Sequence, residues 1–421
     1  MAGNNVFTKT ETVKFDELVA GYEDALEISE HVSLYGIEGE LAERSNDTIW
    51  RPVPKIITSK DRTIGTPVTA LDTKQLAVPA SLGFKKVVPW QLSATEMRDD
   101  AQETSLFTAA SQRLASDINT AIRDVVSLEG TMVVATSGAA GDYDDLAEIE
   151  SLMDELGVMQ FDRKLGINTR DWNGMAGNLA SRTLMQDSVD ALRRSRVGVI
   201  ANLETFKIAS GLALGANAAS ITIPTNGAQV RYVPLSSEST TNGEINVDNR
   251  TQQVTVSSTT GVTAGDCYTV AGISAMHHIT KQSTGRPKTF RVISIDDGTT
   301  MTVSPPMVGA NSSPTDPELA YQNVSVDSTS ATAAITFLNL AATTLNPFWH
   351  KDSIELLVGR YSVPTNQGAA VIKSTTKQGL EVVMTKQFTA NSYESAFFVD
   401  TFFGTVNKNP EMNGVQFFGQ A

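Results

Sequence analysis

Residues 93–130 read SATEMRDDAQETSLFTAASQRLASDINTAIRDVVSLEG, and this stretch carries the clearest structural signal in the chain. Ser93 and Glu96 have the spacing of a capping box, in which the serine hydroxyl accepts the Glu96 amide and the glutamate carboxylate reaches back. One amphipathic helix is predicted, with Gly130 as its left-handed stop. Its apolar residues recur at steps of three or four: Phe107, Ala110, Leu114, Ile118, Ala121, Val125 and Leu128.

The length of this helix indicates how it packs. A helix of about 36 residues would extend roughly 54 Å, about three times the average length. It has one apolar stripe and no sustained heptad of charges, which favours a helix lying along a sheet over a coiled coil. We therefore assign residues 92–130 to one long spine helix.

The two segments before the helix differ in character. Residues 1–45 start polar and become an amphipathic arm, whose acidic face carries Asp16, Glu17, Glu23 and Asp24. That face is either a solvated surface or a docking surface. Residues 46–91 contain five prolines, a density that helices do not tolerate, so we expect an extended, two-stranded loop that reaches a neighbouring molecule. An arm and a loop of this kind would gain their contacts from neighbours.

The segments after the helix predict a mixed fold with an insertion. Residues 131–222 alternate strands, as at 132–135 and 163–168, with a helix at 146–156. Residues 223–330 are rich in Thr, Ser, Val and Gly, show no helical stripe, and contain a hairpin signature at 296–300. They predict an inserted small all-β barrel or sandwich. Strand patterns near 354–358, 370–374, 380–385 and 397–403 resume the main fold in residues 331–421.

Composition and motifs argue against several protein classes. The net charge of −14 is wrong for a protein that grips nucleic acid over its whole surface. The single cysteine, Cys267, allows no intramolecular disulfide, and we expect no signal peptide and no membrane span. No phosphate-binding loop, dinucleotide fingerprint or nucleophile elbow occurs, so we expect neither an enzyme nor a cofactor.

Three polar clusters have two interpretations each. His277 and His278 are adjacent, so on a strand their rings would face opposite sides and would not share a metal ion. The acids Asp142, Asp144 and Asp145 precede a helix, where they complement its dipole; calcium binding is the alternative. A basic cluster would pair with acids of another subunit or contact phosphate; it comprises Arg193, Arg194 and Arg196.

Several colinear stretches resemble the coat proteins of short-tailed phages that infect enteric bacteria. Residues 45–53 (SNDTIWRPV) resemble the family's signature at the end of the N-terminal arm, and residues 245–250 (INVDNR) resemble the segment that opens its inserted domain. Residues 346–349 (NPFW) resemble the return into the main fold. This resemblance implies the α+β capsid fold named for phage Hong Kong ninety-seven, with an N-arm, extended loop, spine helix, and peripheral and axial domains.

The resemblance also implies a function and partners. The chain would be a major capsid protein of the virion that self-assembles into hexamers and pentamers, with a scaffolding protein and a portal protein, in the host cytoplasm. The shell would enclose double-stranded DNA, with weak contact to the DNA and no covalent cross-links. A loop matching residues 236–250 would reach a neighbouring capsomer, with Glu244, Asp248 and Arg250 as candidates for ion pairs; Asp16 and Glu17 resemble the scaffold-docking surface.

Two other functions remain open at this point. The chain could be a different phage structural component, such as a tail or fibre protein that uses its β-rich block for binding. It could also be a β-rich hydrolase with an unrecognised carboxylate pair that includes Asp144. Purified protein would form no closed shells in either case.

Overall fold

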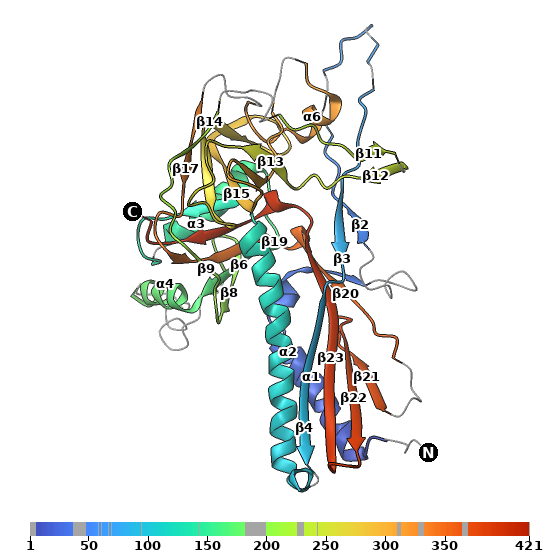
Figure 1. Cartoon of the computed structure of the whole chain (residues 1–421). Coiled ribbons are helices and arrows are strands. Elements are labelled where there is room, and N and C mark those ends of the chain that lie inside the picture. The colour runs from blue at the N-terminus through green and yellow to red at the C-terminus, as the bar shows by residue number, and fades with distance from the viewer. Residues whose placement is uncertain are drawn as a thin grey trace. The chain divides into compact units, whose positions relative to one another are not determined.

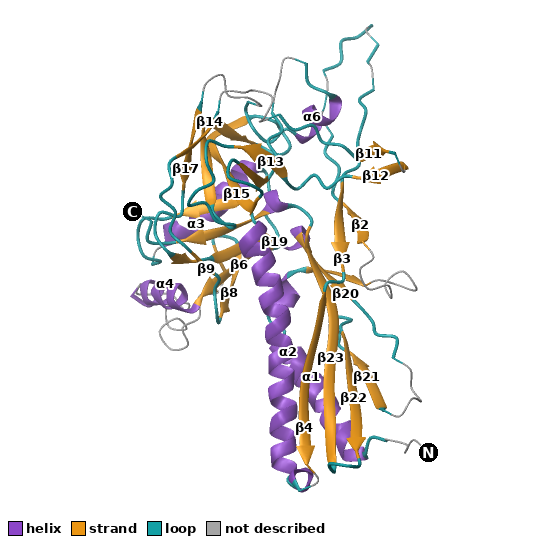
Figure 2. Cartoon of the chain, in the orientation of Figure 1, coloured by secondary structure: helices purple, strands orange, loops and turns teal. Residues whose placement is uncertain are grey.

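The computed structural model describes residues 6–36, 48–57, 59, 61–65, 67–68, 70–93, 95–141, 143–181, 199–224, 231–241, 243–309, 313–326, 332–363 and 369–420. Helices and strands are mixed along the chain, which confirms the predicted α+β class (Figure 2). The chain forms two compact units. The first comprises Met1–Ile49, Ala80–Arg123 and Ile354–Val406, and the second Trp50–Pro79, Asp124–Ser353 and Asn407–Ala421.

A six-stranded sheet is the centre of the first unit. Its strands follow the order β1-β20-β23-β22-β21, and β4 pairs with β23. The sequence placed residues 84–91 in the extended loop, but they belong to β4, which pairs with β23 over ten residues. The strands are β1 (Ser33–Gly36), β4 (Phe84–Ser93), β20 (Ile354–Val358), β21 (Ala370–Thr375), β22 (Glu381–Thr389) and β23 (Glu394–Asn407).

The long helix α2 spans Asp100–Glu129 and starts later than predicted. The bonds of the capping box form, since the Ser93 amide donates to Glu96 Oε2 at 2.9 Å, but they close a short 3-10 turn at Glu96–Arg98. Asp99 then leaves the helical conformation and accepts the Ala101 amide at 3.1 Å. Aspartate is a strong helix cap, so Asp99 starts the helix in place of Ser93.

The helix lies along the sheet as predicted. Phe107 of α2 packs edge-on against Trp90 of β4 and Phe397 of β23, with ring centroids 5.3 and 6.2 Å apart. The buried stripe shifts by one position near the end of the helix, where Val126 is buried and Leu128 is 41% exposed.

The stop of the helix was predicted for the wrong reason. Gly130 does not adopt positive φ. A Cβ atom on Gly130 would lie 2.7 Å from the Val126 carbonyl oxygen and 2.9 Å from Gly414 Cα. The glycine is therefore required by the close approach of another strand and not by a left-handed turn.

The arm helix α1 (Lys9–Ala25) packs within its own unit. Thr8 and Glu11 form a capping box, and Phe15, Leu18 and Tyr22 are buried. The Lys14 ammonium contacts Glu103 of α2 at 2.6 Å. The expectation that the arm leaves its own subunit is therefore wrong for α1, because apolar burial and ion pairing hold it in the unit (Figure 1).

A mixed six-stranded sheet is the first part of the second unit. Its order is β5-β24-β19-β6-β8-β7, and its core includes side chains of α3 and α4. Strands at 132–135 and 163–168 are confirmed at both ends. The elements are β5 (Met132–Ala135), α3 (Tyr143–Leu156), β6 (Arg163–Asn168), α4 (Thr169–Ser181), β7 (Val199–Ile200), β8 (Leu203–Ile208), β19 (Asn346–His350) and β24 (Asn413–Phe417).

The inserted block forms a second sheet with its own core. The strand order is β10-β17-β14-β15-β16-β13, and the Ser257 amide donates to the Thr222 carbonyl at 2.8 Å, which brings the two edges together in a partly closed barrel. The block also contains the short helix α6 (Asp316–Tyr321), which the all-β prediction missed. The strands are β10 (Ile221–Ile223), β13 (Gln252–Thr255), β14 (Cys267–Met276), β15 (Ser283–Ile295), β16 (Thr300–Ser304) and β17 (Ala333–Phe337).

Candidate assembly surfaces

A small exposed hairpin occupies the middle of the predicted inter-capsomer loop. Strands β11 (Ser237–Thr240) and β12 (Gly243–Asn246) pair over four positions, and every residue of β12 is exposed. They stand away from the inserted sheet in Figure 1. Glu244 and Ile245 therefore lie in solvent, as expected for a segment that contacts a partner. A two-stranded hairpin is marginally stable alone, so docking would also stabilise it.

Asn249 closes the base of this hairpin. Its Oδ1 accepts the Leu235 amide at 3.0 Å and its Nδ2 donates to the Leu235 and Val247 carbonyls at 2.8 and 3.0 Å. Tyr232 Oη lies 3.1 Å from the same Oδ1. One amide side chain thus fixes both ends of the hairpin and sets its direction.

Asp248 and Arg250 pair with one another, and Arg250 also contacts two groups far away in the sequence. Arg250 Nη2 lies 2.7 Å from Asp248 Oδ2, and Arg250 Nη1 donates to the Asn407 carbonyl at 3.1 Å. Glu129, 3.9 Å from Arg250 Nη1, has its pKa raised by burial, and the nearby Arg250 opposes this rise. The pair therefore secures the hairpin base, and Glu244 is the predicted charge left exposed on the hairpin.

Replacing Asn249 by Ala should loosen the hairpin while the inserted core stays intact. The change removes several bonds at a partly exposed site, so the free energy of unfolding should fall by about 1 kcal/mol. Limited proteolysis should cleave within 235–249 at least about fivefold faster. The exposed Ser239→Ala change is the control and should leave cleavage unchanged; equal cleavage of the two variants would contradict the role of Asn249.

The extended loop leaves from paired strands β2 (Thr48–Pro52) and β3 (Ala77–Ser81). Its base is tied to the inserted block, because Tyr321 Oη donates to the Lys74 carbonyl at 2.9 Å. Its outer part is exposed, with Ile64 at 98% beside Gly65, which adopts φ +92°.

One face of α1 forms the second candidate surface. Residues Val13, Asp16, Glu17, Ala20 and Asp24 are all exposed and follow helical spacing. They form a stripe of three carboxylates and two apolar side chains, which we call the arm stripe. Glu23 was predicted to lie on the acidic face, but it accepts the Lys377 amide at 2.7 Å.

The remaining polar clusters have structural roles where they are described. Asp144 and Asp145 lie in the first turn of α3, and His277 Nδ1 accepts the Ile279 and Thr280 amides in a turn. Within the described ranges, no three His, Cys, Asp or Glu side chains gather as a metal site, and no helix is long and apolar enough to cross a membrane. The predicted basic cluster of Arg193, Arg194 and Arg196 lies outside the described residues, as does Asp142.

The sequence interpretation missed the charges that hold the arm helix in place. Glu11, Lys14, Leu18 and Tyr22 share one face, so two charged side chains interrupt the apolar stripe. Their partners are Lys386 of β22, 2.5 Å from Glu11, and acids of α2 for Lys14. Charges within an apolar stripe were the available signal that the helix packs against partners of opposite charge.

Comparisons with known proteins identify one family and several similar solved structures. The sequence model of a family described as P22 coat protein, gene protein 5, matches residues 1–419. The capsid of cyanophage P-SCSP1u is 9% identical, with a TM-score of 0.44, over 94% of this chain and 89% of that chain. A Mycobacterium phage Che8 structure is 13% identical, with a TM-score of 0.43, over 94% and 91%. The I-domain of the CUS-3 coat protein is 33% identical, with a TM-score of 0.23, over 30% of this chain and 99% of that chain.

Proposed function

The chain belongs to the P22 coat protein family and is a major capsid protein that forms an icosahedral phage shell, and from that premise we propose how its copies assemble. The subunits form hexamers and pentamers around a scaffolding protein in the host cytoplasm, without covalent cross-links. The family match carries the capsid function. The exposed hairpin, the exposed outer loop and the arm stripe support the proposed contacts.

Between capsomers, we propose that Glu244 contacts a basic group of a neighbouring copy. Exposed ion pairs contribute about 0–1 kcal/mol each, so a single contact is weak, but a shell repeats it in every subunit. Asp248 and Arg250 act indirectly, since their internal pair holds the hairpin base. The basic cluster Arg193, Arg194 and Arg196 is proposed to meet acids of another subunit.

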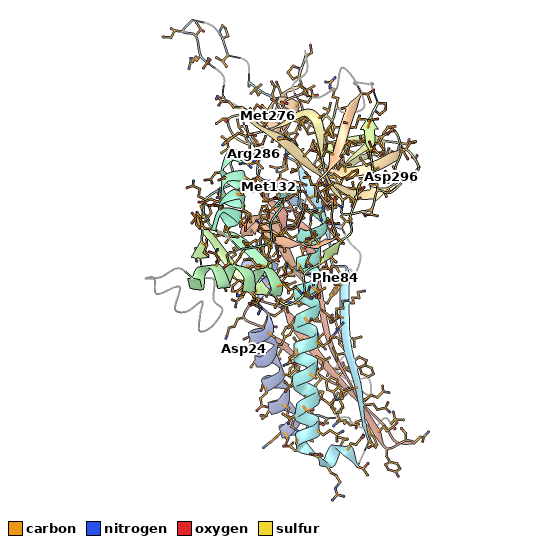
Figure 3. The ribbon with its side chains drawn as sticks, turned by 90° about the vertical axis from the view of Figure 1, so that its left-hand side faces the viewer. Asp24, Phe84, Met132, Met276, Arg286 and Asp296 are labelled. Atoms are coloured by element: carbon orange, nitrogen blue, oxygen red, sulfur yellow. The ribbon has the colours of Figure 1, made fainter. Side chains whose placement is uncertain are left out.

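The scaffolding protein is proposed to dock on the arm stripe. Its carboxylates Asp16, Glu17 and Asp24 would pair with basic side chains, while Val13 offers an apolar contact that is 56% exposed. A basic amphipathic helix has the matching chemistry, with cations at helical spacing beside apolar residues. Asp24 is labelled at the end of the α1 helix in Figure 3.

Replacing Asp16 and Glu17 by Ala should weaken scaffold binding about tenfold without unfolding the subunit, because two surface ion pairs are lost. Binding of the scaffolding protein measured by calorimetry at low salt checks this. Glu30→Ala, an exposed change outside the stripe, should leave the affinity unchanged. Equal affinities for the wild type and the double variant would remove the arm stripe from the docking surface.

DNA and the portal protein complete the proposed partners. A chain with a net charge of −14 would repel phosphate over most of its surface, so packaged double-stranded DNA would be held weakly and could leave the shell. The portal protein would replace one pentamer at a vertex. We propose no catalytic activity, in keeping with a family of structural capsid proteins.

Electron microscopy of the purified chain mixed with its scaffolding protein tests the assembly proposal. Closed shells that form with the scaffolding protein, and fewer or irregular shells without it, are expected. Equal numbers of regular shells in both samples would refute the scaffold-dependent route while leaving the capsid function itself intact.

A further inference from the structure

Strand β15 carries three basic side chains that connect the inserted sheet to the rest of the second unit. Arg286 Nε lies 2.6 Å from Glu155 of α3, Lys288 pairs with Glu411, and Arg291 donates to the Ser127 carbonyl near the end of α2. Their side chains become more buried along the strand, from 40% exposed at Arg286 to 6% at Lys288, and Arg291 is fully buried. Figure 3 labels Arg286 beside α3.

Apolar contacts in this region mainly form the internal core of the inserted block. The inserted block has its own apolar cluster, which includes Tyr268, Phe290 and Ile335 and draws its residues from 221–337. Cys267 of the block packs into a smaller apolar cluster with Val133 of β5 and Val415 of β24, two strands of the mixed sheet. Strand β15 therefore contacts the rest of the second unit mainly through polar groups. The apolar core of the block is built from its own residues.

Glu411 lies at the centre of this polar attachment. It belongs to the short turn Pro410–Met412, immediately before β24. Its Oε1 accepts the Asn323 Nδ2 at 3.1 Å in addition to the Lys288 ammonium, and Asn323 Nδ2 also donates to the Pro306 carbonyl at 2.8 Å. One carboxylate thus connects β15, Pro306 and Asn323 to the mixed sheet that contains β24.

Two lysines and a histidine surround Glu411, and burial lowers the pKa of that histidine, His278. Burial would raise the pKa of Glu411, but Lys288, His278 and Lys281 outweigh it and hold this pKa below its ordinary value. Burial lowers the pKa of Lys281 to about 8, although Glu411 opposes that shift. The cations therefore depend on this carboxylate, and its loss would leave buried positive charge without compensation.

Two cavities adjoin the Glu411 carboxylate. Cavities of about 80 and 20 Å³ are both lined by His278, Asn323 and Glu411. The larger one also reaches Val53 and Leu76 at the base of the extended loop. The larger cavity leaves room for side chains around Glu411 to shift without opening the apolar cluster of the block.

We propose that Glu411, Lys288, Lys281, His278 and Asn323 form a charge joint on which the inserted block can change its angle as a unit. A shell of pentamers and hexamers places identical chains in different surroundings, so an adjustable attachment lets one subunit fit each position. A polar joint can open without exposing the Tyr268–Phe290 core to water. Glu411 is the anchor of the joint.

Hydrogen exchange of the unassembled full-length subunit tests the joint, with Glu411→Gln as the main variant. Amides in 277–288 and 322–326 should exchange at least about tenfold faster, while the β14 and β15 core around Tyr268 and Phe290 should stay within about twofold of wild type. Adding Lys281→Met should return most of the protection, because one uncompensated cation is removed. Unchanged exchange at 277–288, or equal acceleration in the core, would overturn the proposal.

A matched control and a milder variant keep the test decisive. Glu155→Gln removes the carboxylate that pairs with Arg286 at the half-exposed rim and should change exchange at 277–288 by less than about twofold, since exposed pairs contribute little. If Glu411→Gln fails to fold, Glu411→Asp keeps the charge but shortens its reach. It should accelerate exchange about threefold in the same segments, and no acceleration there would overturn the proposal.

Discussion

Replacing Gly414 by Ala should destabilise the subunit by about 3 kcal/mol or more, because the new methyl group has no space. Gly414 of β24 pairs with Met132 of β5. An added Cβ atom would lie 2.1 Å from the Met132 carbonyl oxygen and 2.6 Å from its Cβ. Backbone must move to relieve this contact, and the pairing of β5 with β24 would be disrupted. Urea unfolding of the purified subunit measures the loss.

The surroundings of Gly414 explain why β5 cannot simply move away. The Thr131 amide donates to the carbonyls of Pro410 and Asn413, at 3.2 and 3.1 Å, so the chain between α2 and β5 is bonded to the segment that leads into β24. Gly130 lies against Gly414 in the same place. Two glycines from distant parts of the sequence thus allow the end of the long helix and the last strand to meet.

A third glycine, Gly177, provides the control for this prediction. Gly177 lies in α4, and nothing lies within 4 Å of the place that an added methyl group would take, so Gly177→Ala should stabilise the subunit by about 0.5–1 kcal/mol through helix propensity. Opposite signs for the two changes are expected. A loss below about 1 kcal/mol for Gly414→Ala would show that the strands separate at little cost, contrary to the packing argument.

Local patterns predicted the regular elements well. The strands at 132–135, 163–168 and 354–358 were predicted at their correct ends. Short runs rich in apolar residues mark the first and the third of them. The long helix was correct in type and direction of packing, but its start was wrong because Asp99 competes with Ser93 as a cap. Local capping signals do not by themselves decide which of two neighbouring caps starts a helix.

Contacts between distant segments were not predictable in the same way. The role of Gly130 depends on Gly414, and no local pattern links them. At the candidate surfaces, Glu244, Asp16 and Glu17 are exposed, whereas Asp248 and Arg250 pair with each other, and their roles between subunits stay predictions. Those two residues are adjacent to the hairpin, and only its geometry shows that they face its base.

The structure explains why Asn346 is needed in the 346–349 stretch. It opens the 346–349 stretch and is fully buried. Its Oδ1 accepts the Asn168 amide at 2.8 Å and its Nδ2 donates to Asp171 Oδ2 at 2.8 Å. Asn168 in turn caps α4 by accepting the Arg170 and Asp171 amides at 3.0 and 3.1 Å. Asn346 therefore braces the start of α4 against β19.

Replacing Asn346 by Asp should make the subunit's stability depend on pH in a new way. The change is nearly isosteric, but it puts a carboxylate oxygen where an amide donated to Asp171. Two facing carboxyl groups share a proton, so the pKa of the pair rises in the folded state above its unfolded value near 3.9. The unfolded chain then binds fewer protons than the folded one between about pH 4 and 7, and stability falls as pH rises.

The measurable quantity is the difference in free energy of unfolding between variant and wild type across pH. It should be below about 1 kcal/mol at pH 4.5, where the shared proton restores the hydrogen bond, and reach about 3 kcal/mol at pH 8. Asn346→Leu supplies the contrast, because it leaves the buried Asn168 backbone amide without its acceptor and removes one of the two amide donors to Asp171 at every pH. It should cost about 2–3 kcal/mol throughout. A difference for Asn346→Asp that stays constant with pH would mean that Asp171 turns away, and that the bridge between β19 and α4 is not held in place by its surroundings.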